Sequence, residues 1–149
     1  MKTLQTIFSI TLASLLALTS TQTLAADSKY SEQKVIYHVN YDDVKRQGGA
    51  LRNIQNHINS VGAERVDIKV VMHGNGVELL RHAKTNPALQ ASIDNLKSQG
   101  VDFNVCANTL RGKKIALNEL HDAQESDIVP SGVAELAHLQ QQGYVYLRP

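Results

Sequence analysis

The sequence predicts an α/β protein built on a mainly parallel sheet of about five strands, with helices on both faces in three α/β/α layers. Two observations support this prediction. Short segments rich in β-branched residues alternate with segments of helical period along residues 34–147. The first strand segment, residues 34–40, is apolar on both faces, which is typical of a parallel strand covered on both sides. Such alternation favours βαβ units, whose strands run parallel.

The region after the first strand predicts a long amphipathic helix that ends near Gly62. Its apolar residues recur at helical spacing, at Leu51, Ile54, Ile58 and Val61. Two starting points fit the pattern. The helix begins either near Asp43, whose acidic side chain suits a helix start, or only after Gly48 and Gly49.

The middle of the chain repeats the order of strand and helix. Residues 65–73 alternate Val and Ile with polar residues and then become fully apolar, which predicts the second strand. Residues 74–80 follow as a turn and a short helix. Asn86 is a good N-cap and Pro87 fits the first helical position, so a further helix begins there and ends at Gly100.

The second half predicts three more strands and two more helices: strands at residues 101–106, 127–129 and 144–147, and helices at residues 115–120 and 133–142. Ser131 caps the last helix, whose Val133, Leu136 and Ala137 are expected to face inward. Residues 107–114 are expected to form a loop, which carries the basic Arg111, Lys113 and Lys114.

Residues 1–25 have the pattern of a secretory signal peptide. Lys2 gives a positive start, an apolar run follows, and small residues precede a cleavage site after Ala25. The run falls short of the roughly 20 residues of a membrane span. We therefore expect residues 26–149 to form one periplasmic or secreted domain, with no membrane association after cleavage.

The charge of the chain bears on its partners. Residues 1–25 hold one of the 15 basic residues, so residues 26–149 carry 14 basic and 14 acidic residues. A neutral domain gives no electrostatic basis for binding nucleic acid. Near-zero net charge favours association, so we expect a homo-oligomer.

Cys106 is the only cysteine in the chain. It ends a predicted strand, and in an open α/β sheet ligands bind at the carboxyl ends of the strands. Three interpretations remain open for an unpaired cysteine in an exported protein: a small buried hydrophobe, a bond to another chain, or a reactive thiol.

Other chemically capable residues are predicted to reach the same edge of the sheet. His38 lies near the end of the first strand, His73 ends the second, and Ser131 follows the fourth. In a parallel sheet these ends lie on one rim. Nearby imidazoles and the basic residues that follow Cys106 would lower the pKa of the thiol, and the thiolate is the nucleophilic form.

Several alternatives compete with this prediction. His38 within a strand is also compatible with a core histidine bonded to a backbone carbonyl. His38, His73 and Cys106 could hold zinc, although the sequence lacks short-spaced ligand pairs. Residues 73–76, His-Gly-Asn-Gly, do not match a phosphate or dinucleotide loop, so no cofactor is expected. A serine hydrolase is disfavoured because Gly-x-Ser-x-Gly is absent.

Three motifs resemble the DsrE/DsrF-like family over roughly residues 33–149. They are the Cys-Ala-Asn-Thr turn at residues 106–109, the run from residue 129 to residue 144, and the His73-Gly74 turn. The resemblance implies a three-layer α/β/α domain that assembles as trimers or hexamers. It also implies that some members carry sulfur as a persulfide on the cysteine that Cys106 matches, and pass it between proteins.

The leading hypothesis is therefore an exported persulfide-forming sulfur carrier, or sulfurtransferase-like protein, with a donor or acceptor protein as partner. Cys106 and His73 are its expected catalytic residues, and the expected binding residues are Gly74, Asn108, Thr109, His38 and Ser131. The second hypothesis is a non-catalytic module of the same fold that binds a small ligand or serves assembly. The third is a metal-binding protein that uses His73 and Cys106.

Overall fold

The structure is a computed structural model that describes residues 29–149. The predicted signal peptide, residues 1–25, lies outside the described residues. Within residues 29–149, no helix is both long and apolar enough to cross a membrane.

The core of the fold is one five-stranded sheet in which all paired strands run parallel, as predicted. The strand order is β4-β3-β2-β1-β5. The strands are β1 (Gln33–Val39), β2 (Val66–Met72), β3 (Asp102–Cys106), β4 (Ile128–Val129) and β5 (Val145–Leu147). The chain therefore adds β2, β3 and β4 on one side of β1 and returns to add β5 on the other.

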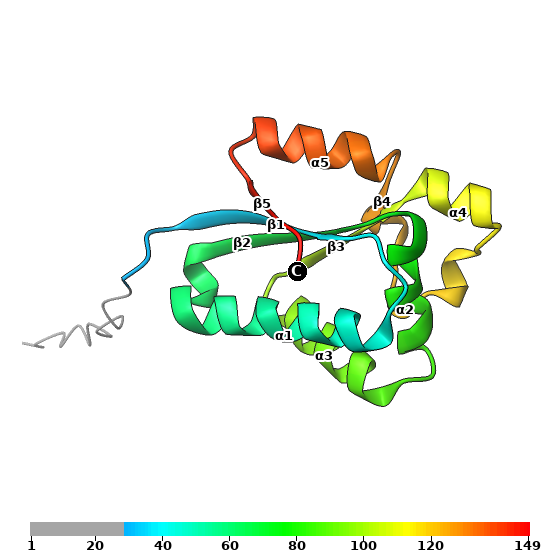
Figure 1. Cartoon of the computed structure of the whole chain (residues 1–149), viewed down its shortest axis with the longest axis horizontal. Coiled ribbons are helices and arrows are strands. Elements are labelled where there is room, and N and C mark those ends of the chain that lie inside the picture. The colour runs from blue at the N-terminus through cyan, green and yellow to red at the C-terminus, as the bar shows by residue number, and fades with distance from the viewer. Residues whose placement is uncertain (1–28) are drawn as a thin grey trace, which may run out of the picture.

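Helices cover the sheet unequally (Figure 1). The helices are α1 (Val44–Val61), α2 (Glu78–Ala83), α3 (Pro87–Ser98), α4 (Ala107–Lys113) and α5 (Gly132–Gln141). In Figure 1, α1 and α3 lie on one side of the sheet and α5 alone lies on the other, while α4 lies beyond the end of β3. The three-layer α/β/α prediction is confirmed, and one of its outer layers is thin.

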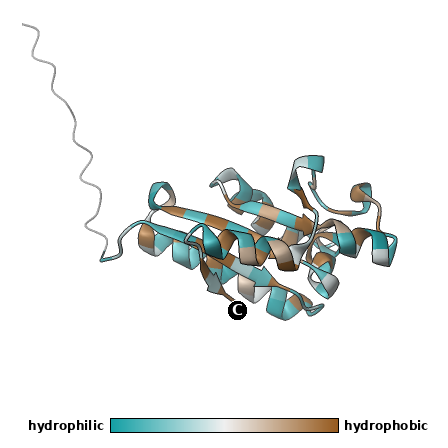
Figure 2. Cartoon of the chain, turned by 90° about the horizontal axis from the view of Figure 1, so that it is seen from above, coloured by the Kyte–Doolittle hydropathy of each residue, from teal (hydrophilic) through white to brown (hydrophobic). Residues whose placement is uncertain are grey.

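Most of the apolar core lies between the sheet and the α1/α3 layer. Val35, Tyr37 and Val39 of β1 pack there against Ile54 of α1 and Ile93 of α3. The helices are amphipathic, and in Figure 2 they carry both hydrophilic and hydrophobic turns. Because side chains alternate along a strand, the remaining residues of β1, β2 and β3 face α5.

The face toward α5 holds a small second core of Ile36, Val71, Leu136, Leu139 and Tyr144. The predicted inward face of α5 is wrong in two of its three residues. Val133 is 64% exposed, and Ala137 is exposed as well. Leu136 is buried as expected, and Leu139 rather than Ala137 completes the buried stripe, because an i, i+3 pair follows the helical period.

The structure fixes one open helix start and corrects the secondary structure predicted for two segments. α1 begins directly after Asp43, whose carboxylate accepts a hydrogen bond from the Arg46 amide at 2.9 Å. Residues 107–113, expected as a loop, form helix α4 instead, with Cys106 as its N-cap residue. The expected helix at residues 115–120 is reduced to one 3-10 turn, Leu117–Glu119.

Candidate functional site

Cys106, His38, His73 and Tyr146 gather on the α5 side of the sheet. His38 follows Ile36 by two residues and His73 follows Val71 by two, so both share the side that packs on α5. Tyr146 pairs with Ile36 across β1 and β5 and therefore lies on this side too. Cys106 ends β3 on this side, because the alternate residues Phe103 and Val105 belong to the opposite core.

Cys106 is buried, with only 4% of its surface exposed. This burial matches one of the three interpretations left open for the cysteine, and the loop expected after it is helix α4 instead. The start of α5 covers the site: a Cβ atom on Gly132 would lie 3.3 Å from the Cβ of Cys106 and 2.8 Å from that of His73. Gly132 therefore allows the helix to approach closely, and the two side chains flank one small space.

The pKa of the Cys106 thiol lies below its ordinary value. Burial alone would raise the pKa, but hydrogen bonds from the Thr109 hydroxyl and from the backbone N–H groups of Gly132, Thr109 and Asn108 outweigh it. These amides belong to the first turns of α4 and α5. N–H groups at helix starts are free to bind anions, so they favour the thiolate.

Thr109 links the cysteine to the turn after β2. Its hydroxyl oxygen accepts a hydrogen bond from the Gly74 amide at 2.8 Å, which leaves the hydroxyl proton for the sulfur. Of the binding residues expected from sequence, Thr109 and the Asn108 backbone thus donate to the thiol, and Gly74 reaches it only through Thr109.

The two histidines are bonded to each other. Nε2 of His38 lies 2.8 Å from Nε2 of His73, and the rings stack with centroids 4.7 Å apart. Nδ1 of His38 lies 2.6 Å from the hydroxyl of Tyr146. His38 is therefore not a core histidine bonded to a backbone carbonyl. It is the middle member of a hydrogen-bonded series of side chains that runs from Tyr146 to His73.

Both imidazoles favour their neutral form. Burial, His73 and Arg148 together lower the pKa of His38 to about 4. Burial also lowers the pKa of His73. Neither ring is among the causes of the shift at Cys106, so the thiolate is stabilised by neutral donors rather than by an imidazolium.

The other expected contributors act locally. The Ser131 hydroxyl accepts from the Ala134 amide at 3.4 Å and caps α5. The Asn108 side chain accepts from Arg111. Lys113 donates to Asn75 and Glu78, at 2.9 and 3.2 Å. Arg111 and Lys113 thus bind other side chains, and neither is among the causes of the lowered pKa.

The described residues contain no group of three or more His, Cys, Asp or Glu side chains placed to hold a metal ion. His38 and His73 approach through Nε2 atoms at hydrogen-bond distance. Two zinc ligands at about 2.1 Å in tetrahedral geometry stand farther apart, at roughly 3.4 Å.

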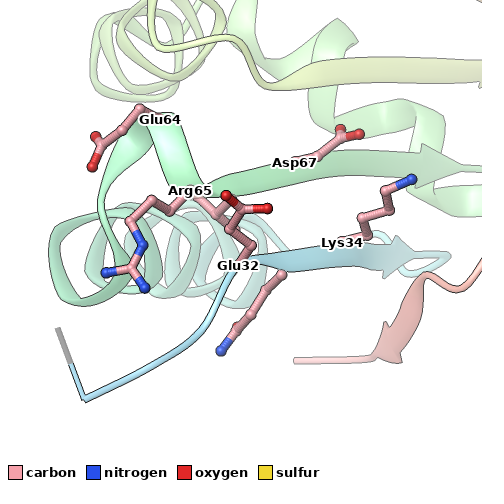
Figure 3. A pocket seen from close by; sticks show the side chains of 7 residues that line it. Glu32, Lys34, Glu64, Arg65 and Asp67 are labelled. Atoms are coloured by element: carbon pink, nitrogen blue, oxygen red, sulfur yellow. The ribbon is translucent and has the colours of Figure 1, made fainter.

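A separate hollow of about 380 Å³ lies at the opposite edge of the sheet, where β1 and β2 begin. Figure 3 shows its labelled side chains, Glu32, Lys34, Glu64, Arg65 and Asp67. Both signs of charge are mixed there, and no lining residue belongs to the group around Cys106.

Sequence patterns place Gly132 on the same rim as Cys106 but assign no role to it or to Tyr146. Gly132 could have been noticed as a glycine directly after a capping serine, a position where a helix start can approach another backbone closely. Tyr146 carried no signal, because its place beside His38 depends on β5 pairing with β1.

Comparisons with known proteins give a family and a fold. The sequence profile of the DsrE/DsrF-like family matches residues 33–149. A solved structure of MTH1491, a protein of unknown function from Methanobacterium thermoautotrophicum, is 32% identical with a TM-score of 0.68, and covers 79% of this chain and all of that one. The ychN protein from E. coli shares the fold at 15% identity, with a TM-score of 0.55, over 80% of this chain and all of its own. No curated protein matches the chain. The chain belongs to the DsrE/DsrF-like family.

Proposed function

We propose that this protein is a sulfur carrier that holds a persulfide on Cys106. The observation that carries the proposal is the set of donors around a buried thiol, the Thr109 hydroxyl and amides from two helix starts, which together lower the pKa of the thiol. A purely structural cysteine in an apolar environment would have a raised pKa and would be inert. Family membership supports the same function, since some members carry a persulfide at the matching position.

The donor groups around Cys106 suit the chemistry of sulfur transfer. The thiolate attacks a sulfane sulfur, a new Sγ–S bond forms, and the donor leaves with the electron pair of the broken S–S bond. Both the thiolate and the resulting persulfide anion are stabilised by N–H and O–H donors. A dithiol mechanism would need a second cysteine, and Cys106 is the single cysteine of the chain.

The test is sulfur loading of the native protein by inorganic polysulfide, followed by intact mass. We expect a gain of one sulfur that a reductant removes. Cys106→Ser should abolish the gain and keep the fold, since thiol and hydroxyl differ little in size. Wild-type protein that gains no sulfur would contradict the proposal.

The contribution of Thr109 can be tested separately. Thr109→Val removes a charge-assisted hydrogen bond worth roughly 1.5–3 kcal/mol, so the pKa of the thiol should rise and alkylation at pH 7 should slow by about tenfold. Thr109→Ser retains the hydroxyl and should behave as wild type. Equal alkylation rates in all three proteins would show that the hydroxyl does not stabilise the thiolate.

A second candidate is a small-ligand or assembly module in which Cys106 only packs. The observation that favours it is the 4% exposure of the thiol. Under this candidate, iodoacetamide would label Cys106 only after denaturation, at every pH. Labelling of the native protein that rises with pH through one titration would exclude it.

We also propose that the chain self-associates at β5. This strand ends the strand order, and its Val145 and Leu147 are 60% and 37% exposed. An apolar edge strand presents backbone groups that another chain can pair. Sedimentation velocity should show an oligomer at micromolar concentration, and Val145→Lys should shift it toward monomer. A wild-type monomer would contradict the proposal.

Export is proposed from the sequence of residues 1–25 alone. N-terminal sequencing of protein from the extracytoplasmic fraction should begin at Ala26 or Asp27. Recovery of the intact Met1 terminus would indicate a retained segment instead.

A further inference from the structure

The chain of side chains from Tyr146 through His38 to His73 connects the protein surface to the space beside Cys106. At its outer end Tyr146 is 38% exposed, and in its middle His38 is only 6% exposed. At its other end His73, which is partly buried, flanks Gly132 together with Cys106. We propose that Tyr146, His38 and His73 form a proton relay that carries the thiol proton of Cys106 to the surface, and that Tyr146 and His38 are positioning residues for this step.

The number of protons in the two hydrogen bonds of the relay allows two arrangements of donors and acceptors. A neutral imidazole carries one N–H, so the Nε2–Nε2 bond at 2.8 Å holds a single proton. The bond at 2.6 Å from His38 Nδ1 to the Tyr146 hydroxyl holds another. In the first state His73 donates to His38, His38 donates to the tyrosine oxygen, and Nδ1 of His73 is an unprotonated base. In the second state both bonds point the other way, and Nδ1 of His73 carries a proton.

Passage between these states moves one proton equivalent without charging either ring. A proton arrives at Nδ1 of His73, one crosses to His38, one crosses to Tyr146, and the original tyrosine proton leaves for solvent. The lowered pKa values of His38 and His73 agree with a relay that stays neutral. The titratable groups around His38 are His73, Arg148 and the bonded Tyr146 hydroxyl, and the charges of His73 and Arg148 oppose an imidazolium there.

The relay rests on the sulfur-carrier function proposed above and completes its proton balance. Cys106 Sγ attacks an inorganic polysulfide, the Sγ–S bond forms, and an S–S bond of the polysulfide breaks. The shortened polysulfide leaves with the electron pair. The thiol proton passes to His73, and an equivalent proton leaves from Tyr146 to solvent, where it can protonate the leaving anion. Because Cys106 is buried, this proton needs a path that a solvent-exposed thiol would not.

The test compares Tyr146→Phe with the matched control Tyr144→Phe. Tyr144 belongs to the small core, and its hydroxyl donates to Asp67, which lies outside the relay. Loading by inorganic polysulfide should slow by about a hundredfold in Tyr146→Phe, which is the lower end of the contribution of a positioned acid–base group. Imidazole buffer should restore this rate, because a small base replaces the lost exit. Wild type and Tyr144→Phe should be insensitive to buffer concentration. A Tyr146→Phe rate equal to wild type, or a slow rate without rescue, would overturn the relay.

A second measurement does not depend on sulfur chemistry. The ¹⁵N shifts of the ring nitrogens report which nitrogen of His38 and His73 is protonated. Tyr146→Phe should change the tautomer populations of both rings together. An unchanged tautomer population of His73 in this variant would overturn the relay. If wild type takes up no sulfur while the two rings remain coupled, the carrier function fails and the relay stands.

Discussion

The two faces of the sheet use the same strands for different purposes. Toward α1 and α3 the strands present mainly apolar side chains to a continuous core, and Gln33 at the start of β1 is a polar exception that bonds His57 of α1. Toward α5 they contribute Ile36 and Val71 to a core of five residues, and beyond it lie His38, His73 and Cys106. Since successive residues of a strand point to opposite faces, each strand contributes one set of residues to stability and another to the site. A substitution on one face should therefore leave the property of the other largely unchanged.

The largest effect should come from the α1/α3 face. Phe103 is completely buried there, and Phe103→Ala should lower the free energy of unfolding by about 3–5 kcal/mol. Its neighbour Asn104 points to the other face and is only partly buried, so Asn104→Ala should change stability by roughly 0.5 kcal/mol or less. Urea unfolding measures both. Equal losses would show that the α5 face contributes as much to stability as the core.

A smaller loss should appear where the α5 face is most tightly packed. A Cβ on Gly132 would lie 2.8 Å from the Cβ of His73, so Gly132→Ala must displace α5 or His73 and should cost about 1–3 kcal/mol. It should also change the pKa of the Cys106 thiol, because the Gly132 amide is one of its donors.

Gly112→Ala is the matched control for Gly132→Ala. Gly112 lies in α4, and a Cβ there would meet nothing within 4 Å. The substitution should therefore stabilise the protein by about 0.5–1 kcal/mol, the usual advantage of Ala over Gly in a helix. Alkylation kinetics that change equally in both variants would show that Gly132 has no special contact with the thiol.

The sequence predicts the sheet far better than the site. Alternating segments identify the strands, and the rule that parallel strands end on one rim correctly brings His73 and Cys106 together. Helix α4 was missed because Asn108, Thr109 and Gly112 are weak helix formers, and tertiary packing decides their conformation. The burial of Cys106 depends on how α5 docks through Gly132. A local sequence pattern predicts neither this docking nor the pairing of β5 with β1 that places Tyr146 beside His38.

Acid should destabilise the protein through the α5 face. The pKa of His38 falls from an ordinary 6.5 to about 4 on folding. Between these values the unfolded chain binds a proton that the folded chain does not, so stability falls as pH drops from 6.5 to 4. The loss from His38 should be on the order of 2 kcal/mol, and above pH 6.5 it should contribute none.

Urea midpoints at pH 7 and pH 4.5 measure this dependence. In His38→Asn the urea midpoint should depend less on pH, because the histidine whose pKa is lowered by folding has been removed. His138→Asn is the control, since His138 is an exposed residue of α5 whose ring bonds Gln142, the residue that caps that helix. An unchanged pH dependence in His38→Asn would show that another group causes the loss.

The smallest effects should come from the two helix caps, one on each face. Asp43 caps α1 at 2.9 Å, and Ser131 caps α5 at a longer 3.4 Å. Replacing either by Ala should cost about 0.5–1 kcal/mol, with Ser131 at the lower end because its hydrogen bond is longer. Only Ser131 precedes Gly132, whose amide donates to the thiol. Ser131→Ala should therefore raise the pKa of Cys106 in the pH dependence of alkylation, and Asp43→Ala should leave it unchanged although it destabilises the fold more. A thiol pKa that follows stability in both variants would instead mean that Cys106 responds to global opening and not to the start of α5.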